Sequence, residues 1–172
     1  MQSLKQGKVY WITGYAGAGK STIARELQKS LQESGKLTVL VDGDEFRAIV
    51  GDSIGYTPEA RLENAWRIAR FCKFLSSQGL TVIAATVSLY KEVRQWMRSE
   101  INDYKVIYVK VTSDTLHERD QKGLYSGVIT GKVKNVSGID ITAEEPVNPD
   151  LILENNQKKH DFSDFTNLIL KL

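Results

Sequence analysis

The chain has 172 residues, of which 41% are hydrophobic and 26% charged, and its formal net charge at pH 7 is +2. This length predicts a single domain over residues 1–172. The composition excludes whole-chain disorder and a collagenous fold, and the lone cysteine Cys72 excludes an intrachain disulfide. The balanced charge does not indicate nucleic acid as a partner. No apolar run approaches the roughly 20 residues that span a bilayer. The polar start Met1–Lys8 lacks the apolar core of a signal peptide, so we expect a cytoplasmic protein with no membrane partner.

Short β-rich runs alternate along the chain with segments of helical periodicity. The pattern predicts, in chain order, a strand at 9–13, a helix at 21–34, a strand at 37–41, a helix at 57–78, a strand at 81–86, a helix at 93–101, a strand at 105–111, a helix capped by Ser113 or Asp114, a strand at 151–153 and a helix at 162–169. The strand at 37–41 ends at Asp42–Asp44, and no helix is predicted over Asp42–Arg47. Residues 121–149 are irregular and too long for a plain connection, so we predict a lid there.

Strands that alternate with helices form βαβ units. We therefore predict an α/β fold with a central five-stranded parallel sheet, helices on both faces and a lid loop. Ligands bind at the carboxyl edge of such sheets. Three segments follow strands at that edge: Gly14–Ser21, Asp42–Arg47 and the loop after Thr86.

The segment Gly14–Ser21 reads GYAGAGKS and matches the phosphate-binding P-loop pattern G-x-x-x-x-G-K-[ST]. Its glycines let backbone N–H groups curl toward phosphate oxygens, and the following helix offers its N-terminus to the anion. Lys20 is predicted to reach the β- and γ-phosphates, and Ser21 supplies a hydroxyl for Mg²⁺. The glycine spacing does not fit the dinucleotide pattern GxGxxG, and no N-K-x-D guanine motif follows. A nucleotide-binding enzyme of the small-molecule kinase type is therefore favoured over a GTPase.

Acidic and basic residues follow the second predicted strand at the same edge. A kinase that acts on a hydroxyl needs a carboxylate beside it, and Asp44 is the candidate. Arg47 and Arg61 are candidates for holding an anionic acceptor, because the guanidinium fork grips phosphate or sulfate in bidentate fashion. Taken alone, the cluster also fits a solvated turn with ordinary surface charges.

Together these segments resemble the adenylylsulfate kinase (APS kinase) family of P-loop kinases from Val9 to about Leu153. The matching pieces are Gly14–Thr22, Val41–Arg47, Gly55–Asn64, Arg119–Tyr125, Gly138–Asp140 and Glu144–Pro149. The resemblance implies transfer of the ATP γ-phosphoryl group, with Mg²⁺, to the 3′-hydroxyl of adenosine 5′-phosphosulfate. Family members are often dimers, so a homodimer is expected, although no surface in the sequence identifies its interface.

The resemblance also implies a role for individual residues. Lys20 and Asp44 would be catalytic, and Ser21 would be the metal ligand. ATP would be bound by Gly14, Ala16, Gly17, Ala18, Gly19, Lys20, Ser21, Thr22 and Arg119. The acceptor would be bound by Asp44, Arg47, Tyr56, Arg61, Asn64, Ser88, Lys122, Leu124, Lys134, Val136 and Ile139.

The sequence departs from the family on the acceptor side. Tyr56 keeps an aromatic platform, but Val136 stands where the family has a phenylalanine that stacks on the acceptor's adenine, and Ser126–Ile129 replaces a run of cations. One lost stacking face is worth about 1–3 kcal/mol. The first candidate acceptor is adenosine 5′-phosphosulfate. The alternative is a related nucleotide such as cytidine diphosphoramidate, used in capsule biosynthesis. A third alternative is a nucleotide-binding module without catalysis.

Overall fold

The computed structural model describes residues 5–51 and 55–172. The residues Met1–Leu4 lie outside the described residues. They are half of the polar start Met1–Lys8, whose sequence led us to expect no signal peptide. Five parallel strands form one sheet in the order β2-β3-β1-β4-β5. In chain order they are β1 (Val9–Thr13), β2 (Thr38–Asp42), β3 (Thr81–Thr86), β4 (Tyr104–Lys110) and β5 (Leu151–Glu154). The predicted α/β architecture is confirmed, with strand ends shifted by about one residue.

The three inner strands are apolar along nearly their whole length, as a parallel sheet covered on both faces requires. In β1, Tyr10 and Ile12 pack with the core on one face of the sheet, and Val9 and Trp11 pack with the core on the other face. Successive side chains of a strand point to opposite faces, so this single strand anchors both cores.

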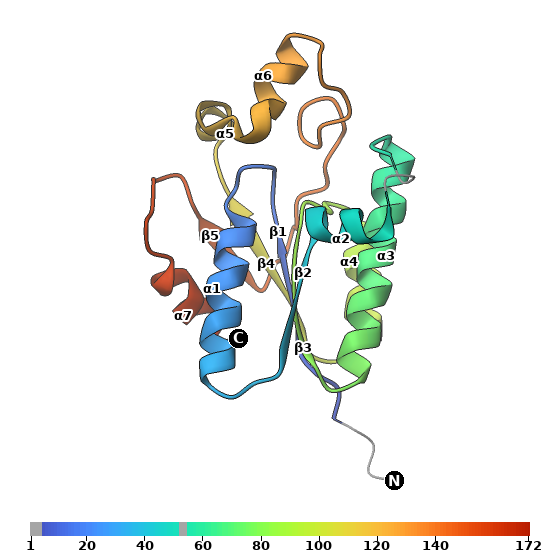
Figure 1. The fold of residues 1–172 in the computed structure, drawn as a ribbon, viewed down its shortest axis with the longest axis vertical. Helices are drawn as coiled ribbons and strands as arrows, with labels where there is room; N and C mark the ends of the chain where they lie inside the picture. Colours follow the sequence, from blue (N-terminus) through green and yellow to red (C-terminus); the bar gives the residue numbers. More distant parts are fainter. Residues whose placement is uncertain (1–4, 52–54) are drawn as a thin grey trace.

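Helices cover both faces of the sheet (Figure 1). On one side lie α1 (Lys20–Glu33) and α7 (Ser163–Ile169), and on the other lie α3 (Pro58–Ser77) and α4 (Lys91–Glu100). Thr57 caps α3 as predicted, because its side chain accepts a hydrogen bond from the backbone N–H of Ala60. None of the helices within the described residues is long and apolar enough to cross a membrane.

The segment after β2, where the sequence pattern predicts no helix, begins a short helix, α2 (Gly43–Val50). The Asp42 side chain caps it by accepting a hydrogen bond from the Asp44 backbone N–H at 3.0 Å. Asp44 and Glu45 then lie in the first turn, where the helix dipole favours negative charge. The sequence pattern does not predict this helix, because it begins with a glycine and is only eight residues long.

The stretch predicted as irregular also contains regular structure. Beyond β4, α5 (Ser113–Arg119) is followed by the 3₁₀ turn η2 (Gln121–Gly123) and α6 (Leu124–Ile129). Thr112, rather than Ser113 or Asp114, occupies the N-cap position of α5. Helices α5 and α6 stand beyond the carboxyl ends of the strands, above the loop between β1 and α1 (Figure 1).

Two isoleucines of the sheet differ in burial, so we expect their alanine variants to differ in the free energy of unfolding. Replacing the fully buried Ile107 of β4 with alanine should lower the free energy of unfolding by about 2–5 kcal/mol, since it removes transfer energy and leaves a cavity. The matched variant Ile152→Ala, at a side chain 49% exposed on the edge strand β5, should change it by less than about 1 kcal/mol. Urea denaturation measures both, and equal losses would contradict the assigned packing.

Candidate active site

The phosphate-binding loop between β1 and α1 is held by side chains from several parts of the chain. The four consecutive carbonyl oxygens of residues 15–18 each accept a hydrogen bond from a different side chain. In loop order the donors are Lys20 Nζ (2.7 Å), Tyr125 Oη (2.8 Å), Arg119 Nη1 (3.3 Å) and Asn155 Nδ2 (2.9 Å). Because a planar trans peptide points its C=O and N–H in opposite directions, fixing these carbonyls also fixes the N–H groups that follow them.

This loop forms one end of a large cleft with a volume of about 780 Å³. The cleft brings together most of the residues that the sequence predicted to bind nucleotides. These are Ala16, Gly17, Gly19, Lys20, Ser21, Thr22, Asp44, Arg47, Tyr56, Arg61, Asn64, Ser88, Lys122, Leu124, Lys134 and Val136.

Four predicted site residues do not line this cleft. Gly14 makes the turn out of β1, where an added Cβ would lie 2.5 Å from the Val109 carbonyl oxygen. Ala18 is fully buried in the core, and Ile139 is 38% exposed away from the cleft. Arg119 lies in a separate, smaller pocket.

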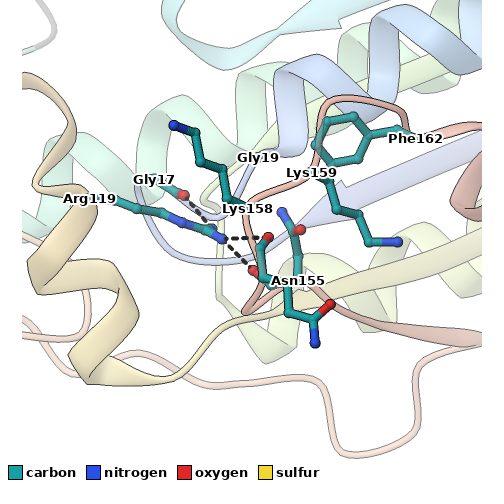
Figure 2. Close-up of a pocket in the computed structure, with 8 residues that line it drawn as sticks. Gly17, Gly19, Arg119, Asn155, Lys158, Lys159 and Phe162 are labelled. Atoms are coloured by element: carbon teal, nitrogen blue, oxygen red, sulfur yellow. Dashed lines mark hydrogen bonds between the residues drawn. The ribbon is translucent and has the colours of Figure 1, made fainter.

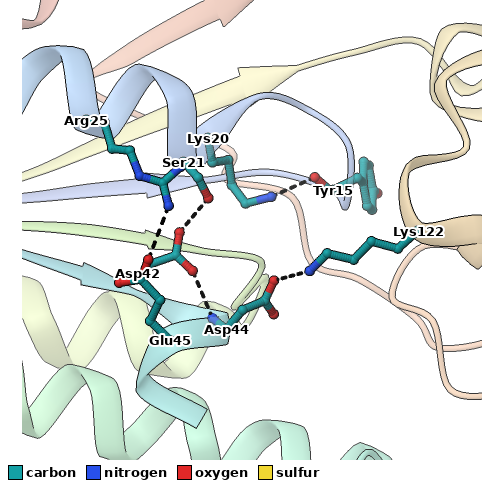
Figure 3. A network of polar contacts seen from close by, with 8 residues as sticks. All are labelled: Tyr15, Lys20, Ser21, Arg25, Asp42, Asp44, Glu45 and Lys122. Atoms are coloured by element: carbon teal, nitrogen blue, oxygen red, sulfur yellow. Dashed lines mark hydrogen bonds and ion pairs between the residues drawn. The ribbon is translucent and has the colours of Figure 1, made fainter. Parts of the chain in front are cut away.

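Asp42 lines the cleft, although no sequence motif predicted a role for it. Its carboxylate accepts a hydrogen bond from Ser21 Oγ at 2.5 Å, and the residue is 6% exposed (Figure 3). Its place directly after a parallel strand, at the edge where the phosphate loop lies, was the signal that could have identified it.

Asp44 faces the cleft as an exposed carboxylate (Figure 3). It accepts a hydrogen bond from Lys122 Nζ at 2.6 Å, and this bond raises the pKa of Lys122 above its usual value. Lys122 reaches Asp44 from η2 with a left-handed backbone, at φ 66°. The lid and α2 therefore meet through this ion pair across the cleft.

The Lys20 side chain is buried, and two carboxylates, those of Asp42 and Asp44, lie near it. Burial lowers its pKa to about 8, while Asp44 and Asp42 act in the opposite direction. Its ammonium nitrogen donates to the Tyr15 carbonyl, so the side chain curls back along the loop. A buried ammonium that lacks a full counter-charge is suited to bind an anion.

The other end of the cleft carries two arginines around Tyr56. Their guanidinium carbons lie 4.6 Å (Arg47) and 5.3 Å (Arg61) from the centre of the Tyr56 ring, within the range of cation–π contacts. Burial, together with the neighbouring Arg47, lowers the pKa of Arg61 from its usual value. Within the described part of the chain, Asn64 Oδ1 is buried without a hydrogen-bond partner, so it is available to a ligand.

The smaller pocket, about 180 Å³, is lined by Gly17 and Gly19 of the phosphate loop, by Arg119 and by residues between Asn155 and Phe162 (Figure 2). Arg119 forms one wall and donates to the carbonyl oxygens of Gly17, Asn155 and Gln157. Phe162 forms another part of the lining. No sequence pattern predicts a role for Asn155, Gln157 or Phe162, because only the fold places this segment beside the loop.

Three comparisons bear on what this cleft is. The family model described as adenylylsulphate kinase matches residues 6–154. The cytidine diphosphoramidate kinase of Campylobacter jejuni is 36% identical over 163 residues, covering 95% of this chain and 94% of that protein. The adenylyl-sulfate kinase of Clostridium kluyveri is 36% identical over 153 residues, covering 88% and 77%.

A solved structure, the APS kinase of Mycobacterium tuberculosis in complex with AMPPNP and APS, matches with a TM-score of 0.88 at 27% identity over 96% of each chain. The resemblance and the P-loop kinase fold expected from the sequence are thereby confirmed. The chain belongs to the adenylylsulphate kinase family, a family of phosphotransferases.

Proposed function

We propose that this protein transfers the γ-phosphoryl group of ATP to the 3′-hydroxyl of a nucleotide that carries an anionic 5′ anhydride. The observation that carries the proposal is a single cleft with a phosphate loop at one end, two arginines at the other and Asp44 among its lining residues. A nucleotide-binding module without catalysis would have no use for an exposed carboxylate in the same cleft as the phosphate loop.

On the donor side, the loop's N–H groups and Lys20 would hold the ATP phosphates, and the pocket beside Arg119 and Phe162 would hold the base. The AMPPNP bound to the related APS kinase supports ATP as the donor.

The residues around Ser21 fit Mg²⁺. Ser21 Oγ and the Asp42 carboxylate are hard oxygen ligands 2.5 Å apart at the phosphate end of the cleft. Among the described residues there is no group of three or more His, Cys, Asp or Glu side chains suited to a metal. This agrees with a Mg²⁺ site in which one or two protein oxygens are completed by phosphates and water. When bound there, Mg²⁺ would neutralise charge on the phosphates.

Asp44 would accept the proton of the acceptor hydroxyl as its oxygen bonds to the γ-phosphorus. The bond from that phosphorus to the bridging oxygen breaks, and ADP leaves. Lys20 would stabilise the negative charge on the transferring group, because a cation held in a buried site acts more strongly than one in water. Arg47 and Arg61 would hold the acceptor's 5′ anion so that its 3′-hydroxyl points at Asp44.

Adenosine 5′-phosphosulfate is the first acceptor we propose. The buried Val136 in the lid wall of the cleft favours a second candidate with a smaller base, cytidine diphosphoramidate. The cytidine diphosphoramidate kinase that matches 95% of this chain supports that candidate. ATP and the acceptor are the partners we propose. A homodimer and a cytoplasmic location stay predictions.

An acceptor panel tests the reaction and separates the two candidates. ADP release should depend on Mg²⁺-ATP and on either adenosine 5′-phosphosulfate or cytidine diphosphoramidate, with ADP, CDP and no acceptor as controls. The variant Val136→Phe should shift kcat/KM toward the adenosine compound by about tenfold, the factor expected from one gained stacking face. Turnover with neither candidate would overturn the proposal.

Asp44→Asn should lower acceptor-dependent kcat by about 10²–10⁴-fold, the usual contribution of a general base. ATP affinity should stay within about twofold, because no part of the ATP site is removed. Glu45→Gln is the matched control, since this neighbouring carboxylate pairs with Arg25 at 3.2 Å and has no part in the proposed chemistry. Equal losses in both variants would contradict the role of Asp44.

ATP binding should take up protons near pH 8. Free Lys20 has a pKa of about 8, so it is half protonated there, and bound phosphate raises that pKa. Calorimetry in buffers of different ionisation enthalpy should therefore show greater proton uptake per Mg²⁺-ATP bound at pH 8 than at pH 6.5. In Lys20→Arg the uptake should vanish, because arginine is already fully charged.

A further inference from the structure

Tyr15, the second residue of the phosphate loop, makes a contact that phosphate binding does not require. Its hydroxyl donates a hydrogen bond to Glu145 Oε1 at 2.8 Å, across 130 residues of sequence. The P-loop pattern leaves this position unspecified. The backbone of Tyr15 serves the donor site through the Lys20 contact, while its side chain contacts the last part of the predicted lid segment, residues 138–145.

The Tyr15 ring also lies directly against the lid backbone at Gly138. A Cβ added to Gly138 would lie 2.3 Å from Tyr15 Cε1 and 2.7 Å from Cδ1, so a side chain there would collide with the ring. Gly138 has φ +87°, a conformation that favours glycine. The hydroxyl and the ring thus touch two separate parts of the same segment.

Gly138 belongs to a compact turn that includes the lid wall of the cleft. The Val136 carbonyl accepts hydrogen bonds from the backbone N–H groups of residues 139–141, and Gly138 N–H donates to the Ile141 carbonyl. The Asp140 carboxylate accepts from Asn135 N–H and Val136 N–H. Val136 and Ser137 of this turn line the main cleft. The position of the turn therefore sets the shape of that wall.

The residue next to Glu145 in the chain is held by three hydrogen bonds. The adjacent Glu144 is tied to α4 and the chain before it: its N–H donates to the Leu89 carbonyl, its carboxylate accepts from Lys91 N–H, and its carbonyl accepts from Arg94. Burial, and then the Glu145 hydrogen bond, raise the pKa of Tyr15 to about 12. The phenol therefore remains a hydrogen-bond donor throughout the physiological pH range.

We propose that Tyr15 and Glu145 form a latch, in which the hydrogen bond and the Tyr15–Gly138 contact hold the lid turn of residues 135–141 against the phosphate loop. Tyr15 is thus a positioning residue, whose side chain orients the acceptor wall of the cleft. This inference rests on the proposed function only for the identity of the substrates.

The test compares Tyr15→Phe, which keeps the ring, with Glu145→Ala and Glu145→Gln. Tyr15→Phe and Glu145→Ala should each raise KM for the acceptor by about fivefold, or ~1 kcal/mol at 1.4 kcal/mol per tenfold, the contribution of one hydrogen bond. KM for ATP should stay within about twofold. Glu145→Gln should restore the wild-type acceptor KM, because the amide oxygen still accepts from Tyr15. The acceptor KM of the double variant Tyr15→Phe/Glu145→Ala should be no higher than that of either single variant, because both changes remove the same hydrogen bond.

Tyr104→Phe is the matched control, since among the described residues its buried hydroxyl has no hydrogen-bond partner and it packs in the core that α3 and α4 cover. Its KM values should equal those of the wild type. The acceptor is whichever of adenosine 5′-phosphosulfate and cytidine diphosphoramidate the wild type phosphorylates. A rise in both KM values together, or an unchanged acceptor KM in Tyr15→Phe, would overturn the latch.

A measurement without substrate keeps this inference separate from the proposed function. Hydrogen exchange of the backbone amides at residues 138–141 should be faster in Tyr15→Phe than in wild type and Tyr104→Phe. If the wild type phosphorylates neither acceptor, the proposed function fails while the exchange data still decide on the latch. Identical exchange in all three proteins would overturn it.

Discussion

The hydrogen bonds that hold the four carbonyls of the phosphate loop are the constraint on which the rest of the site depends. A glycine-rich loop has many accessible conformations, and only those with converging N–H groups bind phosphate. The donors that select this conformation come from α1, the end of α5, α6 and the residue after β5. Three of these four donors lie outside the loop, so its conformation depends on the assembled fold as well as on its own Lys20.

The same bonds make the donor and acceptor sides of the cleft interdependent. Arg119 and Tyr125 belong to the segment that also carries Lys122, and Lys122 reaches Asp44 across the cleft. Moving this segment would disturb the loop's carbonyls and free the Asp44 carboxylate together. Substrate closure in kinases uses such shared contacts to align reacting groups and exclude water.

The charges of the cleft are arranged along its length. Buried Lys20 and the pair Ser21–Asp42 lie at the phosphate end, and the two arginines around Tyr56 lie at the other end. Val136, where the resemblance implies a departure from the family's aromatic residue, lies in the lid wall of this cleft. In the proposed reaction the transfer groups contact the phosphates and the hydroxyl rather than the base, so a different acceptor base would leave those contacts unchanged.

Local patterns in the sequence determined the parallel sheet, the long helices and the phosphate loop, because apolar periodicity and glycine spacing act within a few residues. They also placed Asp44 and Arg47 correctly at the carboxyl edge. They could not reveal the short helix α2, because its N-cap and the favourable charges in its first turn offset a weak helix propensity. They also could not reveal the hydrogen bond between Ser21 and Asp42. The sequence also could not identify Asn155 and Glu145 as important, since each makes its hydrogen bond to a residue more than 100 positions away in the chain. Only the tertiary structure decides such contacts, because side-chain hydrogen bonds depend on how the elements pack and not on their order along the chain.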